Sequence, residues 1–190
     1  MKLIHEPTGH VAQPTQLVIF TQNTPQFLEN DLLKSSETYF RGSMAIFFHS
    51  IDTIPVKLPK AALKRWINTC VEVEKHTIGT INIIFCSDEY LLAINLEHLQ
   101  HDYLTDIITF DYTTGTRISG DLYVSIERLR ENALKFGVSV QEELYRVVIH
   151  GVMHLCGYKD KTKKDAATMR KQEENCLLKL RECLGFSSFT

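Results

Sequence analysis

The chain has 190 residues, of which 44% are hydrophobic, and a formal net charge of -2. This composition favours one soluble globular domain, and no apolar run reaches the roughly 20 residues that a membrane-spanning helix needs. The charge excludes a general electrostatic attraction to nucleic acid, so such an affinity must come from local basic clusters. The five cysteines are scattered and form no C-x-x-C pair, which indicates reduced thiols in a cytoplasmic protein.

Residues 1–43 differ from the rest of the chain. They contain three prolines and one short β-like run, LVIF at 17–20, whereas a clear strand pattern, MAIFFHSI, begins at Met44. We predict that 1–43 is an N-terminal extension, poorly ordered or a non-native leader, and that the fold occupies 44–190. The alternative is a genuine N-terminal strand and loop.

After Met44 the pattern of apolar residues is regular. We expect strands at 44–50, 81–86, 108–112 and 121–125, and helices near 60–75, 88–99 and 125–136. The run INIIFC at 81–86 predicts a strand that is buried on both faces. The strands at 108–112 and 121–125 flank the turn TTGTRISG, which predicts a hairpin or a close pair.

Two further helices are marked by their caps. Ser139 and Glu142 form a capping box that opens one helix, and Gly157 ends it. Thr162 and Asp165 open a last amphipathic helix that extends to about 184. Because helices and strands alternate, we predict an α/β (α+β) fold with a small mixed sheet of about four strands and about five helices.

The sequence HGVMHLCGYKD at 150–160 has the spacing of a metal site. On a helix, His150 and His154 lie on one face, and Gly157 can turn the chain back so that Asp160 becomes a third ligand. Zinc binds histidine nitrogens and carboxylate oxygens, and three protein ligands leave a fourth position open for water. We therefore predict one catalytic Zn2+ at the C-terminal end of a core helix, held by His150, His154 and Asp160.

Other interpretations of this motif remain open. The two histidines can be ordinary core or surface residues, and Asp160, which lies between Lys159 and Lys161, can be an ordinary loop acid. A zinc metalloprotease of metzincin-like spacing is a further alternative. Such peptidases have a glutamate directly after the first histidine as general base, but here that residue is Gly151.

Together with three upstream motifs, these residues resemble the YbeY family of metal-dependent, single-strand-specific endoribonucleases. The family motif H-G-x-x-H-L-x-G-Y-x-H/D matches 150–160, an asparagine matches Asn95, T-[DN]-[VI]-[LI]-[ST]-F matches 105–110, and G-D-[IL] matches 120–122. The resemblance covers the chain from about Met44. It implies a small α/β fold and a cytoplasmic zinc nuclease that matures the 3′ end of small-subunit ribosomal RNA and acts in ribosome quality control. The implied partners are ribosomal RNA and the ribosome or a ribosomal protein, with no membrane.

Three residues depart from the family pattern. Asp160 stands where the third ligand of the family is usually histidine. A carboxylate is also a zinc ligand, and it adds a negative charge to the site. Leu99 stands where the family usually has an arginine that is thought to meet RNA phosphate or to assist catalysis. Arg146 stands one helical turn before His150, where the family often has histidine.

The helical spacing suggests a role for Arg146. Its guanidinium can bind a phosphate held near the metal, and the alternative is an ion pair with Glu142 or Glu143 on a solvated helix. Beyond the metal-bound water, the candidates for a catalytic group are Arg146 and Asp106. Asp106 can equally be structural, and for Asp121 we favour a structural role.

Basic side chains after the metal motif are candidates for RNA contact. Lys159 and Lys161 flank Asp160, and with Arg146 they form the predicted RNA-binding set, although such a charge run is often a solvated helix start. The absence of the family arginine at position 99 also leaves a third class of function open. In that case the protein is a noncatalytic ribosome-assembly factor in which zinc only stabilises the fold.

Overall fold

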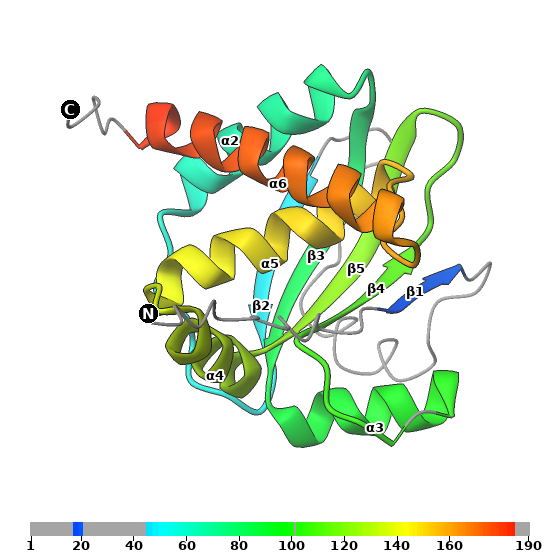
Figure 1. Cartoon of the computed structure of the whole chain (residues 1–190), viewed down its shortest axis with the longest axis vertical. Helices are drawn as coiled ribbons and strands as arrows, with labels where there is room; N and C mark the ends of the chain where they lie inside the picture. The colour runs from blue at the N-terminus through cyan, green and yellow to red at the C-terminus, as the bar shows by residue number, and fades with distance from the viewer. Residues whose placement is uncertain (1–16, 21–44, 101, 185–190) are drawn as a thin grey trace, which may run out of the picture.

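The computed structural model describes residues 17–20, 45–100 and 102–184, and for 17–20 and Leu99 it describes the backbone alone. The described chain forms one five-stranded sheet with helices on both of its faces (Figure 1). The strands are β1 Leu17–Phe20, β2 Ala45–Ser50, β3 Thr77–Cys86, β4 Ile107–Asp111 and β5 Arg117–Ser125. The helices are α2 Lys60–Val73, α3 Asp88–Leu99, α4 Ile126–Phe136, α5 Val140–Leu155 and α6 Lys163–Cys183.

The sheet is mixed, with the strand order β1-β4-β5-β3-β2. β2, β3 and β5 are parallel, β4 is antiparallel to β5, and β1 is parallel to β4. The predicted α/β class is confirmed, and the predicted close pair is the antiparallel pair β4–β5. The sheet has one strand more than the four expected, because the LVIF run of the predicted extension pairs with β4. The rest of 1–43, and Met44, lie outside the described residues.

The central strand β3 begins four residues before its predicted start. The segment Thr77–Thr80 contains Gly79, and the pairing register between β3 and β5 shifts between Ile78 and Ile81. A Cβ at position 79 would lie 2.2 Å from the Ser119 Oγ atom, so the close approach of the two strands favours glycine. Glycine and a register shift both interrupt the apolar alternation that marks a strand in sequence.

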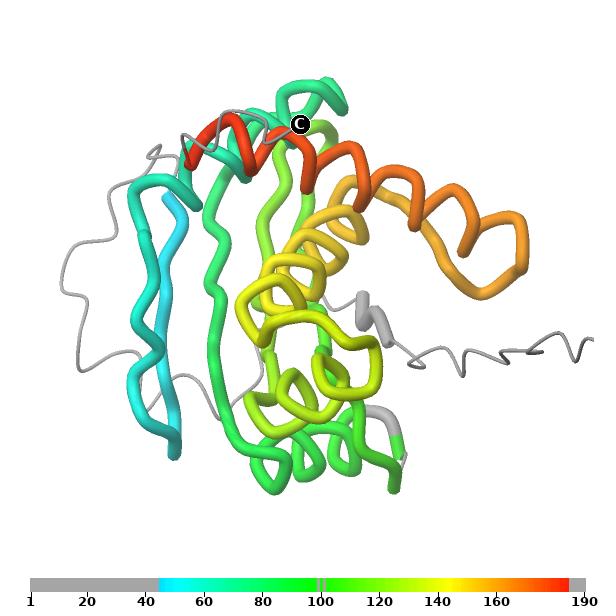
Figure 2. Tube along the Cα trace, turned by 60° about the vertical axis from the view of Figure 1, so that its left-hand side comes forward, coloured from blue at the N-terminus to red at the C-terminus, as the bar shows by residue number. Residues whose placement is uncertain are grey.

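The first face of the sheet is covered by three helices and carries the larger core. α5 lies over β4 and β5, α2 lies over β3, and α6 packs against both α2 and α5 (Figures 1 and 2). Ile81, Ile83 and Phe85 of β3 point to this face and are buried. The Trp66 indole of α2 donates a 2.6 Å hydrogen bond to the Cys176 carbonyl of α6, which joins these two helices.

The second face of the sheet packs against α3. Its smaller core consists of alternate residues of the same strands together with one α3 residue: Ile84, Cys86, Leu91, Ile108, Phe110 and Tyr123. The predicted burial of β3 on both faces is therefore confirmed. None of the described helices is long and apolar enough to cross a membrane.

Candidate metal centre

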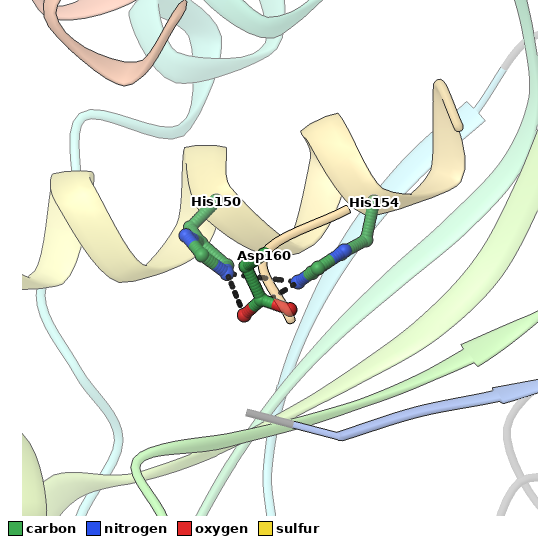
Figure 3. A group of neighbouring side chains, drawn as sticks. All are labelled: His150, His154 and Asp160. Carbon is green, nitrogen blue, oxygen red and sulfur yellow. Dashed lines mark hydrogen bonds and ion pairs between the residues drawn. The ribbon is translucent and has the colours of Figure 1, made fainter. Parts of the chain in front are cut away.

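The two histidines of the 150–160 motif project from one side of α5 toward the same point (Figure 3). Their side chains are buried, with 7% of His150 and 3% of His154 exposed. Their Nε2 atoms lie 2.8 Å apart, and the Asp160 Oδ2 atom lies 3.7 Å from each. The ligand atoms of all three residues lie within 4.8 Å of one another.

The turn after α5 brings Asp160 to the histidines. Gly157 has a φ of 92°, and its N–H donates to the His154 carbonyl at 2.8 Å while the Tyr158 N–H donates to the Met153 carbonyl at 3.1 Å. These two bonds form a Schellman motif, which requires a residue at positive φ and therefore favours glycine. The predicted reversal of the chain at Gly157 is confirmed.

The outer nitrogen of each histidine faces an oxygen. The His150 Nδ1 atom contacts the carboxylate of Glu173, and the His154 Nδ1 atom donates to the Tyr158 carbonyl at 2.9 Å. Because both partners are acceptors, each ring carries its proton on Nδ1 and directs the Nε2 lone pair toward Asp160. Two lone pairs that converge on one point repel each other, and a cation bound there removes the repulsion.

The donor set fits a zinc ion. Zinc takes imidazole nitrogens and carboxylate oxygens at about 2.0–2.2 Å, so two ligand atoms of a tetrahedral site lie about 3.4 Å apart. The separations of 2.8 and 3.7 Å bracket this value. The charge also fits. Burial by itself opposes ionisation of Asp160, but its hydrogen bond with His154 and the proximity of both histidines hold the pKa of Asp160 below its ordinary value.

Gly151 explains why the glutamate of zinc peptidases is missing. A Cβ at this position would lie 2.7 Å from both the Ile107 Cδ1 and the Leu122 Cδ2 atoms, so α5 packs on the sheet through a bare backbone here. A glutamate would have to enter the apolar core and could not serve as a base. The packing therefore argues against the peptidase alternative.

The structure places Arg146 inside a cluster of three carboxylates. Its Nε and Nη2 atoms donate to Glu143 at 2.9 and 2.6 Å, and the guanidinium lies 3.6 Å from Asp106 and 3.9 Å from Glu173. Burial would lower the pKa of Arg146, but the hydrogen bonds to Glu143 and the three negative charges hold it above its ordinary value. This is the ion pair of the alternative interpretation, except that Glu143 is buried and not solvated. A phosphate contact by Arg146 stays a prediction.

Asp106, the second candidate for a catalytic group, is only 2% exposed. Its Oδ2 atom accepts a 3.2 Å hydrogen bond from Asn132, whereas its Oδ1 atom has no hydrogen-bond partner among the described residues. Burial raises the pKa of Asp106, and the nearby Arg146 and His150 offset only part of this effect.

Lys159 and Lys161, the other predicted RNA-binding residues, are exposed on both sides of Asp160.

Asp121 and Asn95 of the upstream motifs have structural hydrogen bonds. Asp121 is buried and accepts hydrogen bonds from the Asn82 amide at 2.7 Å and the Tyr112 hydroxyl at 3.2 Å, which agrees with the structural role predicted for it. Asn95 is buried in α3 and donates to the Tyr103 carbonyl at 2.8 Å. The side chain of Leu99 lies outside the described structure.

Sequence reasoning missed Glu173, and it named Glu143 only as a partner of Arg146 on a solvated helix. Glu173 lies on the apolar stripe of α6 with Met169, Cys176 and Leu180, all of which are buried. The signal was a charged residue within an apolar stripe, which is rare unless its charge is paired. Glu143 occupies the equivalent place on α5, one turn before Val147.

Comparisons with known proteins agree with this fold and identify a family. The family model for Endoribonuclease YbeY matches residues 49–181. The Endoribonuclease YbeY of Flavobacterium johnsoniae is 54% identical over 113 residues, which are 60% of this chain and 81% of that protein. That of Parabacteroides distasonis is 45% identical over 139 residues, 73% of this chain and 98% of that protein. The solution structure of TM1509 from Thermotoga maritima is 25% identical, with a TM-score of 0.51 over 76% of this chain and 97% of that one. The chain belongs to the YbeY endoribonuclease family.

Proposed function

We propose that this protein is a zinc-dependent endoribonuclease that cleaves single-stranded RNA. Its substrate is precursor ribosomal RNA at the 3′ end of the small-subunit RNA, and it acts in the cytoplasm, in contact with the ribosome and in ribosome quality control. The relatives named Endoribonuclease YbeY support the reaction class. The observation that carries the proposal is the convergence of His150, His154 and Asp160 on one point.

Each residue of the site has a part in this function. His150, His154 and Asp160 would hold the ion and leave one position open to the substrate. When bound, zinc supplies a Lewis acid that polarises a phosphoryl oxygen and lowers the pKa of a water molecule. The Asp160 carboxylate offsets part of the charge of the ion, which a third histidine would not do. None of these roles needs a glutamate at position 151.

The RNA backbone would approach the side of the site where Lys159 and Lys161 are exposed. Each lysine neutralises a phosphate, so binding should weaken as the salt concentration rises. Asp106 is too deeply buried to meet the substrate directly, so we assign it an indirect role through Arg146, which it faces at 3.6 Å.

The test is cleavage of a small-subunit precursor RNA that ends in an unpaired 3′ extension. The zinc-loaded full chain is compared with His154→Ala, and with His76→Ala as a matched control, because His76 lies in the segment before β3 and is not one of the three ligands. We expect cleavage by the full chain and by His76→Ala, and none by His154→Ala.

Two results would contradict the proposal. Equal traces of cleavage in all three proteins, with zinc lost only from His154→Ala, would make the metal structural and favour a noncatalytic assembly factor. Zinc-dependent cleavage of an unfolded protein, without cleavage of RNA, would favour the peptidase in spite of Gly151.

A further inference from the structure

Glu173 is a buried acidic residue whose contacts explain its position in the fold. It lies in the middle of α6, is 6% exposed, and is surrounded on its stripe by apolar residues. Burying a carboxylate is strongly unfavourable unless its charge is paired and hydrogen-bonded. The contacts of its two oxygens therefore indicate why it is there.

The two oxygens of Glu173 face different partners. The Oε1 atom contacts the His150 Nδ1 atom, and the Oε2 atom lies 3.9 Å from the Arg146 Nη1 atom. Arg146 is itself held by the two hydrogen bonds that it donates to Glu143. Three charged groups, Glu143, Arg146 and Glu173, are thus linked in a row that ends at the His150 imidazole and joins α5 to α6.

The second histidine is held in a different way. The His154 Nδ1 atom donates to the Tyr158 carbonyl, which belongs to the turn that follows the same helix. The orientation of His154 is therefore set locally. The orientation of His150 depends on a side chain from another helix, 23 residues later in the chain.

We propose that Glu173 is a positioning residue of the metal centre. It holds the His150 ring with its proton on Nδ1 and its Nε2 lone pair toward the ion, and Arg146 holds Glu173 in place for this task. A carboxylate bonded to the outer nitrogen fixes the ring and makes the inner nitrogen a stronger ligand, and the loss of such a partner typically weakens metal binding about 10–100-fold. This inference rests on the metal site of the proposed function.

The test compares Glu173→Gln with Glu174→Gln in the full chain. Glu174 is the next residue on α6 and is exposed, so it is a matched control for the loss of one acid from this helix. Zinc affinity is measured by competition with a chromophoric chelator. We expect Glu173→Gln to bind zinc 10–100-fold more weakly, and Glu174→Gln to bind it as the unmodified chain does.

A spectroscopic measurement separates positioning from a general effect on stability. In the zinc-loaded protein, the NMR signal of the His150 Nδ1 proton should shift in Glu173→Gln, because its partner is then neutral, whereas the signal of His154 should stay in place. A second variant, Glu173→Asp, keeps the charge near Arg146 but withdraws the carboxylate by one methylene. It should also bind zinc at least tenfold more weakly, and it serves if Glu173→Gln fails to fold.

The outcomes distinguish the two proposals. Zinc affinity within twofold of the control in Glu173→Gln, or an undiminished affinity in Glu173→Asp, would overturn the positioning role and leave the metal site intact. No zinc binding by the unmodified chain would overturn the metal site itself, and the positioning role with it.

Discussion

The two faces of the sheet both bury acidic side chains, but their networks end differently. On the second face, both oxygens of Asp121 accept hydrogen bonds, from Asn82 and Tyr112, and the Asn82 side-chain Oδ1 atom faces the His49 Nε2 atom at 3.3 Å. On the first face, the network that contains Glu173 leads to the metal centre. There the lone pairs of His150 and His154 and the carboxylate of Asp160 are directed at one point. The network of the second face is closed within the protein, and the network of the first face is open toward a ligand.

This difference shows how the same residue types serve stability in one place and binding in another. A polar network whose donors and acceptors all match one another rigidifies a core. A network that leaves several acceptors aimed at one position needs a cation to complete it, and three helices with the larger core hold those acceptors in place. The four predictions below test this contrast, three of them on the first face and one on the second.

The largest expected effect follows from placing a glutamate at position 151. Gly151→Glu would force a carboxylate between Ile107 and Leu122, so we expect a loss of more than about 4 kcal/mol of folding free energy or no folded protein. The measurement is urea unfolding followed by circular dichroism. Gly115→Ala is the control, because Gly115 has a positive φ but open space around it, and it should lose only about 1 kcal/mol. A Gly151→Glu protein as stable as the unmodified chain would refute the packing.

Removal of zinc should have the next largest effect. With free zinc at about 1,000 times its Kd, binding adds about 4 kcal/mol to the free energy of unfolding. We expect a chelator to remove this increment, and we expect His154→Ala to lack it from the start. Asp121→Asn should lose the same increment as the unmodified chain, because Asp121 lies on the other face. Unfolding curves that are identical with and without chelator would argue against a metal in the network of the first face.

Replacement of Arg146 should be somewhat milder. Arg146→Gln leaves three buried carboxylates without their cation, and we expect a loss of about 3 kcal/mol by urea unfolding. Arg130→Gln, on the exposed side of α4, should lose less than about 0.5 kcal/mol.

Kinetics of Arg146→Gln at saturating zinc sharpen the interpretation. If Arg146 acts only through Glu173, restoring the metal should restore the KM for RNA to that of the Arg130→Gln control. A KM that stays raised at saturating zinc would instead support direct contact between Arg146 and a phosphate.

The smallest effect is expected on the second face and depends on pH. Burial raises the pKa of Asp121, and its hydrogen bonds with Asn82 and Tyr112 only partly oppose this. The folded state therefore binds this proton more tightly than the unfolded state does, so its contribution to stability falls as the pH rises from about 4 through the raised pKa.

Asp121→Asn removes the titrating carboxyl group and with it this pH-dependent loss of stability. The variant can keep the hydrogen bonds with Asn82 and Tyr112, because its amide oxygen can accept from Asn82 and its amide nitrogen can donate to Tyr112. We expect the variant to be more stable by about 1 kcal/mol at pH 7 and equal to the unmodified chain below about pH 4. The measurement is the urea midpoint across this range, with the exposed Asp102→Asn as control. A variant less stable at pH 7 would show that the charge of Asp121 contributes favourably.

Local patterns in the sequence were sufficient for most of the elements and for the three side chains that meet at the candidate metal site. The capping box at Ser139 and the glycine at 157 mark the ends of α5, and both act through neighbours within a few residues. The spacing of His150 and His154 places both rings on one side of the helix whatever surrounds it. The start of β3 could not be predicted from the sequence, because Gly79 interrupts the strand pattern. Its small size matters only where Ser119 of another strand comes close to it.

The sequence by itself therefore determined the helix that carries the histidines, the turn that returns Asp160, and the family to which these motifs point. Only the tertiary structure decided which partner each of the other groups would have. Helix periodicity marks Glu173 as an acid on an apolar stripe, but its contact with His150 exists because α6 packs against α5. Arg146 likewise lies among Glu143, Asp106 and Glu173 because three segments far apart in the chain meet there. Local geometry repeats along the chain and can be read from it, whereas the pairing of buried charges depends on which elements come together.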